Sequence, residues 1–290
     1  MLSQLAVNGL IAGAMIALLA VGFTIIYLGC RFFIFTYAAS YTWAAYTPLL
    51  LLHRLPHLLS ALLGIAVAVS IGVLLEVFIF GPTRKRVRRG LVLMLASIGA
   101  YIILQNIISL TFGDTTRSIR DWTVKEGHTF LTARVTDTQL FIVGVSLGVL
   151  CLTGLLLEFT AWGRWLRAVA NDADLAQVVG INMNRTILFA TVLGSAIAGI
   201  AGILISLDTD LIPTMGFQAL LLGIVGCIVG GVTNIKGAAM GGLFLGFAQQ
   251  LSVWKLPTQW QDAIIFLVLI LFLVLRPKGL LGKPLARSMV

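Results

Sequence analysis

Acidic, nucleophilic and metal-binding side chains are scattered through this sequence and do not form a recognisable catalytic site. The three histidines, His53, His57 and His128, have no Cys, Glu or Ser at the spacing of a zinc site or a catalytic triad. Glu76 and Glu158 lie at the ends of apolar runs, where a carboxylate can extend to water, so we expect neither of them to relay protons. The sequence therefore predicts no catalytic residue and no metal site.

The sequence also lacks the GxxxxGK[ST] loop that binds nucleotide phosphates. Any ATP and Mg²⁺ that the protein's function requires must be bound by partner subunits, and we expect no cofactor on this chain. Cys30, Cys151 and Cys227 lie in or beside apolar runs without paired spacing. We interpret them as small core residues, with no disulfide among them.

A row of hydroxyl groups follows the first apolar run, in the segment FFIFTYAASYTWAAY, residues 32–46. In a helix, Thr36, Tyr37, Ser40 and Tyr41 would share one side that spans about 140°. Polar groups inside a bilayer face protein or a water-filled cavity, because unsatisfied ones are costly there. Two interpretations stay open: the hydroxyls line a translocation pathway, or they bond to neighbouring helices near an aromatic belt.

The segment MGFQALLLGIVGCIVGG, residues 215–231, is short, rich in glycine and preceded by the helix-breaking Pro213. Interrupted apolar segments of this kind can mark a transport site. Phe217, Gln218 and Gly223 are then candidates for lining it. Ordinary helix packing explains the pattern equally well.

The polar passage NDADLAQVVGINMNR, residues 171–185, separates two long apolar runs. Asn171 or Asp172 can cap a helix that has Asp174 near its positive end, and Gly180 can end it. Such a helix would carry an apolar stripe made by Leu175, Val178 and Val179. The stripe suits a groove on a partner protein or the surface of a lipid bilayer, and the neighbouring Arg164, Trp165 and Arg167 would favour the bilayer.

These candidate groups must be positioned by helices in a membrane, because 59% of the 290 residues are apolar and only 11% are charged. Six runs reach the roughly 18 apolar residues that cross a bilayer as a helix. They are residues 5–28, 58–81, 91–112, 140–158, 187–207 and 260–275, and shorter candidates are residues 32–52, 217–232 and 238–254. The sequence thus predicts an all-α polytopic helix bundle of about eight or nine membrane segments, which forms a single domain over residues 1–290.

Small residues four positions apart predict close helix packing within that bundle. The pairs are Gly9/Gly13, Ser195/Gly199, Ala198/Gly202, Gly226/Gly230, Gly237/Gly241 and Gly242/Gly246. The first run has no basic residue before it and no cleavage site after it, so we interpret it as a spanning helix and not as a cleaved signal peptide.

The net charge of +9 is concentrated in alternate loops. Residues 84–89, the loop 159–186 and residues 276–287 are strongly basic, whereas the loop 113–138 mixes both signs. The positive-inside rule places the basic loops in the cytoplasm and loop 113–138 on the opposite side of the membrane. With nine crossings, the N-terminus is outside and the C-terminus inside. The basic charge then serves orientation and contact with membrane lipid, and we expect no nucleic-acid partner.

Several passages carry a family resemblance that extends over nearly the whole chain. They are residues 8–27, 167–185, 194–204, 228–246 and RPKGLLG, residues 276–282. In order and in content they are similar to the LivH-type permeases of branched-chain amino acid ABC importers. Asp174 to Gly180 also resembles the Glu-Ala-Ala-x-x-x-Gly loop of ABC importer permeases, with Asp and Leu in place of Glu and the first Ala.

This resemblance implies a permease subunit of the bacterial inner membrane that works by alternating access and is not itself an enzyme. Its implied partners are a LivM-like second permease, two cytoplasmic ABC ATPase subunits and a periplasmic substrate-binding protein. The loop helix would dock on an ATPase and couple it to the membrane helices. The implied coupling residues are Asp174, Leu175, Ala176, Val178 and Gly180.

One departure from the family concerns the substrate. Where the family has Asn-Phe-Ala-His-Gly, this sequence has Ile-Phe-Thr-Tyr-Ala at residues 34–38, and only Phe35 is retained. The resemblance implies a branched-chain amino acid or a related small polar solute as the cargo. If Phe35 and its neighbours line the pathway, the departure instead favours a cargo other than leucine, isoleucine and valine, such as urea, an amide or another small carboxylate. A stand-alone secondary carrier is a further alternative, although it would need charged groups deep in the bundle that the sequence does not show.

Overall fold

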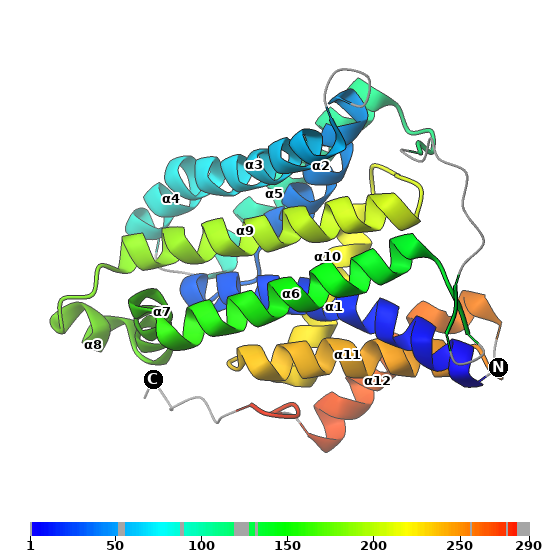
Figure 1. Cartoon of the computed structure of the whole chain (residues 1–290). Helices are drawn as coiled ribbons and strands as arrows, with labels where there is room; N and C mark the ends of the chain where they lie inside the picture. The colour runs from blue at the N-terminus through cyan, green and yellow to red at the C-terminus, as the bar shows by residue number, and fades with distance from the viewer. Residues whose placement is uncertain are drawn as a thin grey trace. The chain divides into compact units, whose positions relative to one another are not determined.

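The computed structural model of this chain describes residues 2–51, 56–87, 90–118, 128–130, 133–255, 257–276 and 278–282. His53, much of the loop 113–138 and the last basic residues of the chain lie outside these ranges. The chain divides into two compact units: unit 1 contains Met1–Thr24, Arg120–Gly154 and Leu221–Val290, and unit 2 contains Ile25–Ile119 and Leu155–Leu220. Both are built almost entirely from helices (Figure 1), which confirms the predicted all-α class.

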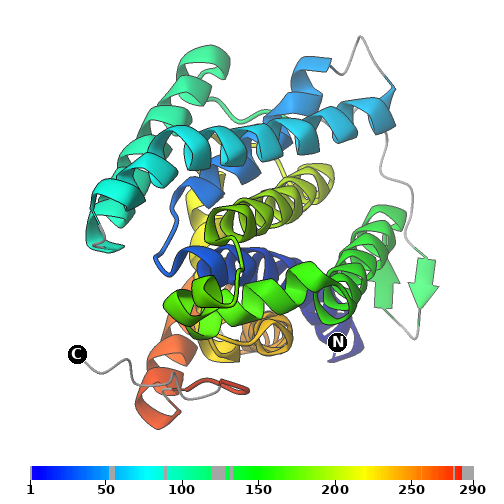
Figure 2. The ribbon, with the colours of Figure 1, turned by 90° about the vertical axis from the view of Figure 1, so that its left-hand side faces the viewer.

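Unit 1 takes most of its residues from four groups of elements. They are α1 (Leu2–Cys30), the strands β1 (His128–Phe130) and β2 (Ala133–Val135) with α6 (Asp137–Phe159), α10 (Met215–Gly230) with α11 (Ile235–Ser252), and the short η2 (Thr258–Trp260) with α12 (Gln261–Leu275). The end of α1, the end of α6 and the start of α10 belong to unit 2. The two strands pair antiparallel and are drawn as arrows in Figure 2. A buried apolar cluster joins α1, α10, α11 and α12 through Ile16, Val225, Val229, Leu245 and Ile265.

Glycines let the helices of unit 1 meet backbone to backbone. A Cβ atom added to Gly242 of α11 would lie 2.3 Å from Ala17 Cα of α1, and one added to Gly246 would lie 2.1 Å from Gly13 N. A Cβ on Gly241 would lie 2.4 Å from the Gly226 carbonyl oxygen of α10. The close packing predicted from the small-residue pairs is therefore confirmed at these positions.

Unit 2 is built around three helices that pack on one another: α2 (Thr36–Leu51), α3 (His57–Leu75) and α9 (Met183–Asp208) (Figures 1 and 2). A five-residue π-helix, η1 (Glu76–Phe80), continues α3 into α4 (Gly81–Arg86), and α5 (Gly90–Phe112) packs on α2. Before α9 come two short helices, α7 (Ala161–Asn171) and α8 (Ala173–Val178). Gly202 of α9 meets the Tyr41 carbonyl of α2 so closely that a Cβ there would lie 2.3 Å from the oxygen.

Six helices of the described chain are long and apolar enough to cross a membrane. They are Ser3–Cys30, His57–Arg86, Gly90–Phe112, Asp137–Phe159, Met183–Asp208 and Thr258–Leu275. A seventh span is added if α10 and α11, which bend by 115° at their junction, count as one broken span. The predicted eight or nine segments are thus not confirmed, because α2 has only 16 residues and α10 and α11 do not pass separately.

Exposed apolar side chains on the spanning helices agree with a lipid environment. On α12, Leu267, Ile270 and Val274 are 62%, 63% and 75% exposed. A soluble protein rarely exposes such a continuous apolar face, whereas lipid tails cover it at no cost.

Candidate functional site

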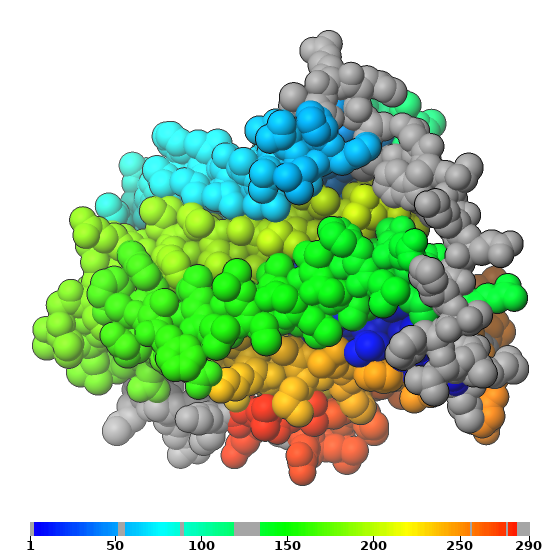
Figure 3. All heavy atoms as spheres, in the orientation of Figure 1, coloured from blue at the N-terminus to red at the C-terminus, as the bar shows by residue number. Residues whose placement is uncertain are grey.

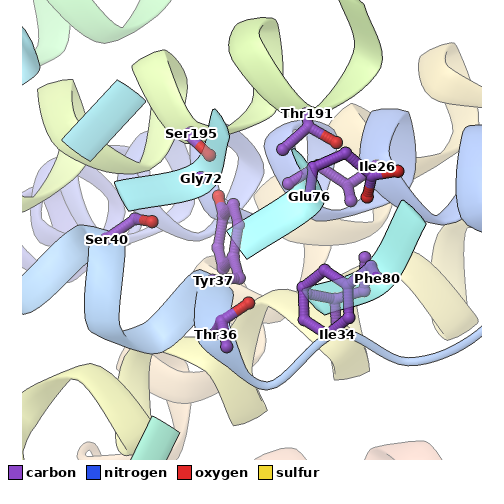
Figure 4. Close-up of a pocket in the computed structure, with 10 residues that line it drawn as sticks. All are labelled: Ile26, Ile34, Thr36, Tyr37, Ser40, Gly72, Glu76, Phe80, Thr191 and Ser195. Atoms are coloured by element: carbon purple, nitrogen blue, oxygen red, sulfur yellow. The ribbon is translucent and has the colours of Figure 1, made fainter. Parts of the chain in front are cut away.

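Unit 2 contains a small polar pocket in which several of the predicted pathway residues meet (Figure 4). It lies among the end of α1, the segment leading into α2, the junction of α3 with η1, and α9. The ten lining residues are Ile26, Ile34, Thr36, Tyr37, Ser40, Gly72, Glu76, Phe80, Thr191 and Ser195. The cavity volume is about 10 Å³, which is enough for roughly one water molecule.

The structure brings three of the predicted hydroxyl groups together here. Thr36, Tyr37 and Ser40 come from the first turns of α2, and all three are buried. Tyr41 is also buried but does not line the pocket, and Phe35 precedes α2 with its backbone N–H donating to Ser97 Oγ at 3.2 Å. The pocket therefore gathers part of the hydroxyl row predicted from the sequence.

Glu76 corrects a sequence expectation. Its carboxylate does not extend to water: the residue is 6% exposed, its side chain lines the pocket, and the carboxylate accepts from Arg84 Nη1 at 2.8 Å and Nη2 at 3.4 Å. The physical reason is the π-helix η1, because its wider turn rotates the chain less per residue and so carries Arg84 toward the face of Glu76. A buried carboxylate requires such a partner.

Sequence reasoning missed three polar residues of this pocket, Glu76, Thr191 and Ser195. Thr191 and Ser195 lie one turn apart in α9, and both are buried. The available signal was the Thr/Ser spacing inside an apolar run, together with an acidic residue eight positions before an arginine. Neither signal says which helix the groups face.

The candidates in α10 lie elsewhere, and none of them lines this pocket. Phe217 lies in the part of α10 that belongs to unit 2, and its ring stacks on the Tyr101 ring of the same unit, with centroids 6.0 Å apart. Gly223 packs in unit 1 against Leu19, whose carbonyl oxygen would lie 3.2 Å from an added Cβ. Gln218 belongs to the same helix.

The polar loop forms the short helix α8 with the predicted ends. Asp172 Oδ1 accepts hydrogen bonds from the backbone N–H groups of Asp174 and Leu175, both at 3.0 Å, so Asp172 is the N-cap. Gly180 follows the helix with φ +89°, a backbone conformation that favours glycine. Both features were predicted from the sequence.

The apolar stripe of α8 has no cover within the described chain. Leu175, Val178 and Val179 are 63%, 84% and 80% exposed, whereas Ala176, which lies beside the stripe, is 5% exposed. The residues of α8 form part of the open surface at the left edge of Figure 3. A stripe this exposed is available to another protein or to lipid.

The neighbouring helix α7 differs, since its apolar side is already buried. Leu166 and Val169 are each 1% exposed, and α7 packs on α9. The Trp162 ring stacks on Phe189 of α9, with ring centroids 4.9 Å apart. α7 thus packs on α9 of the same unit and presents α8 at its end.

Comparison with known proteins decides the family. The family described as "Branched-chain amino acid transport system / permease component" matches residues 5–273. The chain belongs to this permease family. It is therefore a transport component and not an enzyme. Across the residues that the structure describes, no three His, Cys, Asp or Glu side chains form a group that could hold a metal ion.

Relatives of this permease cover almost its full length. The chain is 31% identical to the high-affinity branched-chain amino acid transport system permease protein LivH of Escherichia coli K12, over 96% of this chain and 94% of the relative. It is 29% identical to BraD of Pseudomonas aeruginosa, over 97% of this chain and 96% of the relative. A probable LivH permease of Methanocaldococcus jannaschii is 28% identical, with 95% and 91% covered. The LivH-type resemblance predicted from the sequence is thus confirmed.

A solved structure shares the fold. The structure described as PsaBC from Streptococcus pneumoniae in complex with Fab matches with a TM-score of 0.54, at 12% identity, over 93% of this permease and 91% of that chain. At this identity the likeness concerns the fold alone.

Proposed function

We propose that this permease carries a branched-chain amino acid, or a related small polar solute, across the bacterial inner membrane as part of an ATP-driven ABC importer that works by alternating access. The observation that carries the proposal is the 31% identity to E. coli LivH over 96% of the chain, since that relative is described as part of a high-affinity branched-chain amino acid system. BraD of P. aeruginosa carries the same description.

The family supports the partners that we propose. The permease pairs with a LivM-like second permease, receives its solute from a periplasmic substrate-binding protein, and is driven by two cytoplasmic ATPase subunits that bind ATP and Mg²⁺. The exposed stripe of α8 supports the ATPase partner, because three apolar side chains on one short capped helix suit a groove on a protein.

The five coupling residues have different roles in this proposal. Leu175 and Val178 enter the ATPase groove, since both are largely exposed. Ala176 is buried within the loop 159–186 and holds α8 in position there. Asp174 lies in the first turn, at the positive end of the helix. Gly180 turns the chain toward α9.

The translocation pathway passes the hydroxyl-lined part of unit 2. Thr36, Tyr37 and Ser40 contact the solute, and the buried Glu76 and Thr191 add polar groups beside them. The remaining pathway candidates are Phe35, Tyr41, Phe217, Gln218 and Gly223. Because residues 34–38 depart from the family pattern, urea, an amide or another small carboxylate is the alternative cargo.

The chain forms one transmembrane domain over residues 1–290 in about eight or nine segments, with α2, α10 and α11 as short segments inside the bundle. Its loop 159–186 and C-terminus lie in the cytoplasm, and its loop 113–138 and N-terminus lie in the periplasm. The interleaved units support a single domain, because neither of them is a continuous stretch of chain. The basic loops support the orientation.

The experiment is a co-purification of the ATPases with the unaltered permease and with two variants of α8. Val178→Asp places a charge in the stripe, while Gln177→Asp places the same charge on an exposed position of α8 outside it. Loss of a buried Val contact costs about 1.5 kcal/mol or more, so we expect at least a tenfold lower ATPase affinity for Val178→Asp. Gln177→Asp should stay within about twofold of the unaltered chain.

Equal binding by both variants would contradict the coupling role and favour a helix that lies on the lipid surface. The cargo is tested in proteoliposomes that contain all partners, with labelled leucine, isoleucine, valine and urea as substrates. Uptake by the permease alone, driven by an ion gradient, would instead support a secondary carrier.

A further inference from the structure

One arginine links the loop that presents α8 to the segment that enters the pocket. Arg31 lies directly after α1, and its Nη2 donates to the carbonyl oxygens of Ala170 and Asn171, the last two residues of α7. The Asn171 contact measures 3.2 Å. All of these residues belong to unit 2.

The backbone of Arg31 shows that this position is held by its surroundings. Among the described residues it is the one non-glycine residue with positive φ, at 61°. A side chain in this conformation costs about 1 kcal/mol or more, and it persists where other contacts determine it. Its N–H donates to the Tyr27 carbonyl at 2.8 Å, which ends α1.

The guanidinium suits the end of α7 for a chemical reason. The last carbonyl groups of a helix have no donor within the helix, and their dipoles favour a cation. Arg31 supplies two donations and the charge. The first turn of α7 is held as well, since Thr160 Oγ1 accepts from the Gly163 N–H at 3.4 Å.

The contact lies between two functional segments of the chain. On one side, Asn171 directly precedes Asp172, the N-cap of α8. On the other side, Arg31 begins the five-residue segment that leads into α2, and Ile34, Thr36 and Tyr37 line the pocket. A displacement of α7 would thus be passed to the start of α2 through the Arg31 side chain, in addition to the packing of α7 on α9.

We propose that Arg31 is a positioning residue that transmits the movement of α7 and α8 to the start of α2, and so to the pocket. This proposal rests on the proposed function, because the movement is driven by the ATPases bound at α8. Loss of the guanidinium should leave ATPase docking intact and uncouple ATP hydrolysis from transport.

The test uses the complete transporter in proteoliposomes and measures solute taken up per ATP hydrolysed. Arg31→Asn removes the cation but keeps a residue that tolerates positive φ, so backbone strain does not confuse the result. Arg31→Lys keeps the positive charge without the two donors of the guanidinium fork, and Arg164→Asn removes an exposed cation from α7 itself as a matched control.

We expect the ratio for Arg31→Asn to fall at least about fivefold, with ATPase recovery within about twofold of the unaltered complex. Arg31→Lys should recover part of the ratio, and Arg164→Asn should leave it unchanged. An unchanged ratio for Arg31→Asn would overturn the proposal, and so would loss of the ATPases from this variant, since Arg31 would then support docking. If the unaltered permease itself recovers no ATPase, the proposed function fails first.

Discussion

Replacement of Gly242 by alanine tests the backbone contact between α1 and α11. The new Cβ would lie 2.3 Å from Ala17 Cα and 2.4 Å from Ala17 N. Carbon atoms in contact normally stay about 3.5–4.0 Å apart. No side-chain rotation can relieve the overlap, because both opposing atoms are backbone, so the two helices must separate.

The size of the effect follows from two opposing contributions. Overpacking that moves backbone costs up to about 3 kcal/mol, while alanine gains up to about 1 kcal/mol over glycine as a helix former. The net loss is about 2 kcal/mol, which for a chain of this size lowers Tm by roughly 4 °C.

The matched control is Gly148→Ala in α6, where a Cβ would meet nothing within 4 Å. This variant keeps only the helix-propensity gain, so its Tm should rise by roughly 2 °C. Cys151, which we expected in the core, is exposed, so the assay uses a Cys151→Ser background. Thermal unfolding in detergent can then be followed with a thiol-reactive dye, since Cys30 and Cys227 are buried and become accessible on unfolding. A Gly242→Ala variant as stable as Gly148→Ala would refute the close contact of α1 with α11.

Three further predictions concern the pocket and the loop. Glu76→Gln leaves the largely buried Arg84 without its carboxylate and should lower stability by about 3 kcal/mol in the same dye assay. Glu76→Leu combined with Arg84→Leu should recover most of that loss, and equal losses in the two proteins would contradict a specific pair. Asp172→Ala removes the acceptor for two N–H groups of α8, costs about 1 kcal/mol, and should weaken ATPase binding roughly fivefold in titrations, while Asp172→Asn retains the cap. Gly180→Ala forces a side chain into φ +89° at a cost of about 1–2 kcal/mol and should also weaken ATPase binding. Gly180→Asn should be the milder variant. If both variants bind the ATPases as tightly as the unaltered chain does, the loop does not require this turn.

Local features of this permease could be predicted from the sequence because they depend on neighbouring residues. The apolar run at residues 91–112 became α5 (Gly90–Phe112), since transfer into lipid is a sum over adjacent side chains. The ends of α8 were also predictable, because a capping Asp172 and a following Gly180 act on their own backbone.

The pocket could be predicted only in part, since its polar groups come from helices far apart in the sequence. Thr36 and Tyr37 were found from their shared helix face, but Glu76 was interpreted as a residue that reaches water. Only the π-helix η1 and the hydrogen bond from Arg84 show that the Glu76 carboxylate stays buried in the pocket. The number of membrane crossings could not be predicted either, because hydropathy does not reveal the 115° bend between α10 and α11.

The burial of α1 has a consequence for how the chain is made. In the window that marks α1 as a membrane span, 89% of the residues are buried, and Gly13 and Ala17 meet α11, which is synthesised about 230 residues later. At 5–20 residues per second, the ribosome needs roughly 10–45 s to reach that point. During this interval α1 lacks α11, and its glycine surface is exposed to lipid or to the insertion machinery. A chain that stops before Ile235 lacks α11 and so has no partner for the glycine surface of α1. The first helix therefore completes its packing only after the last helices have been synthesised.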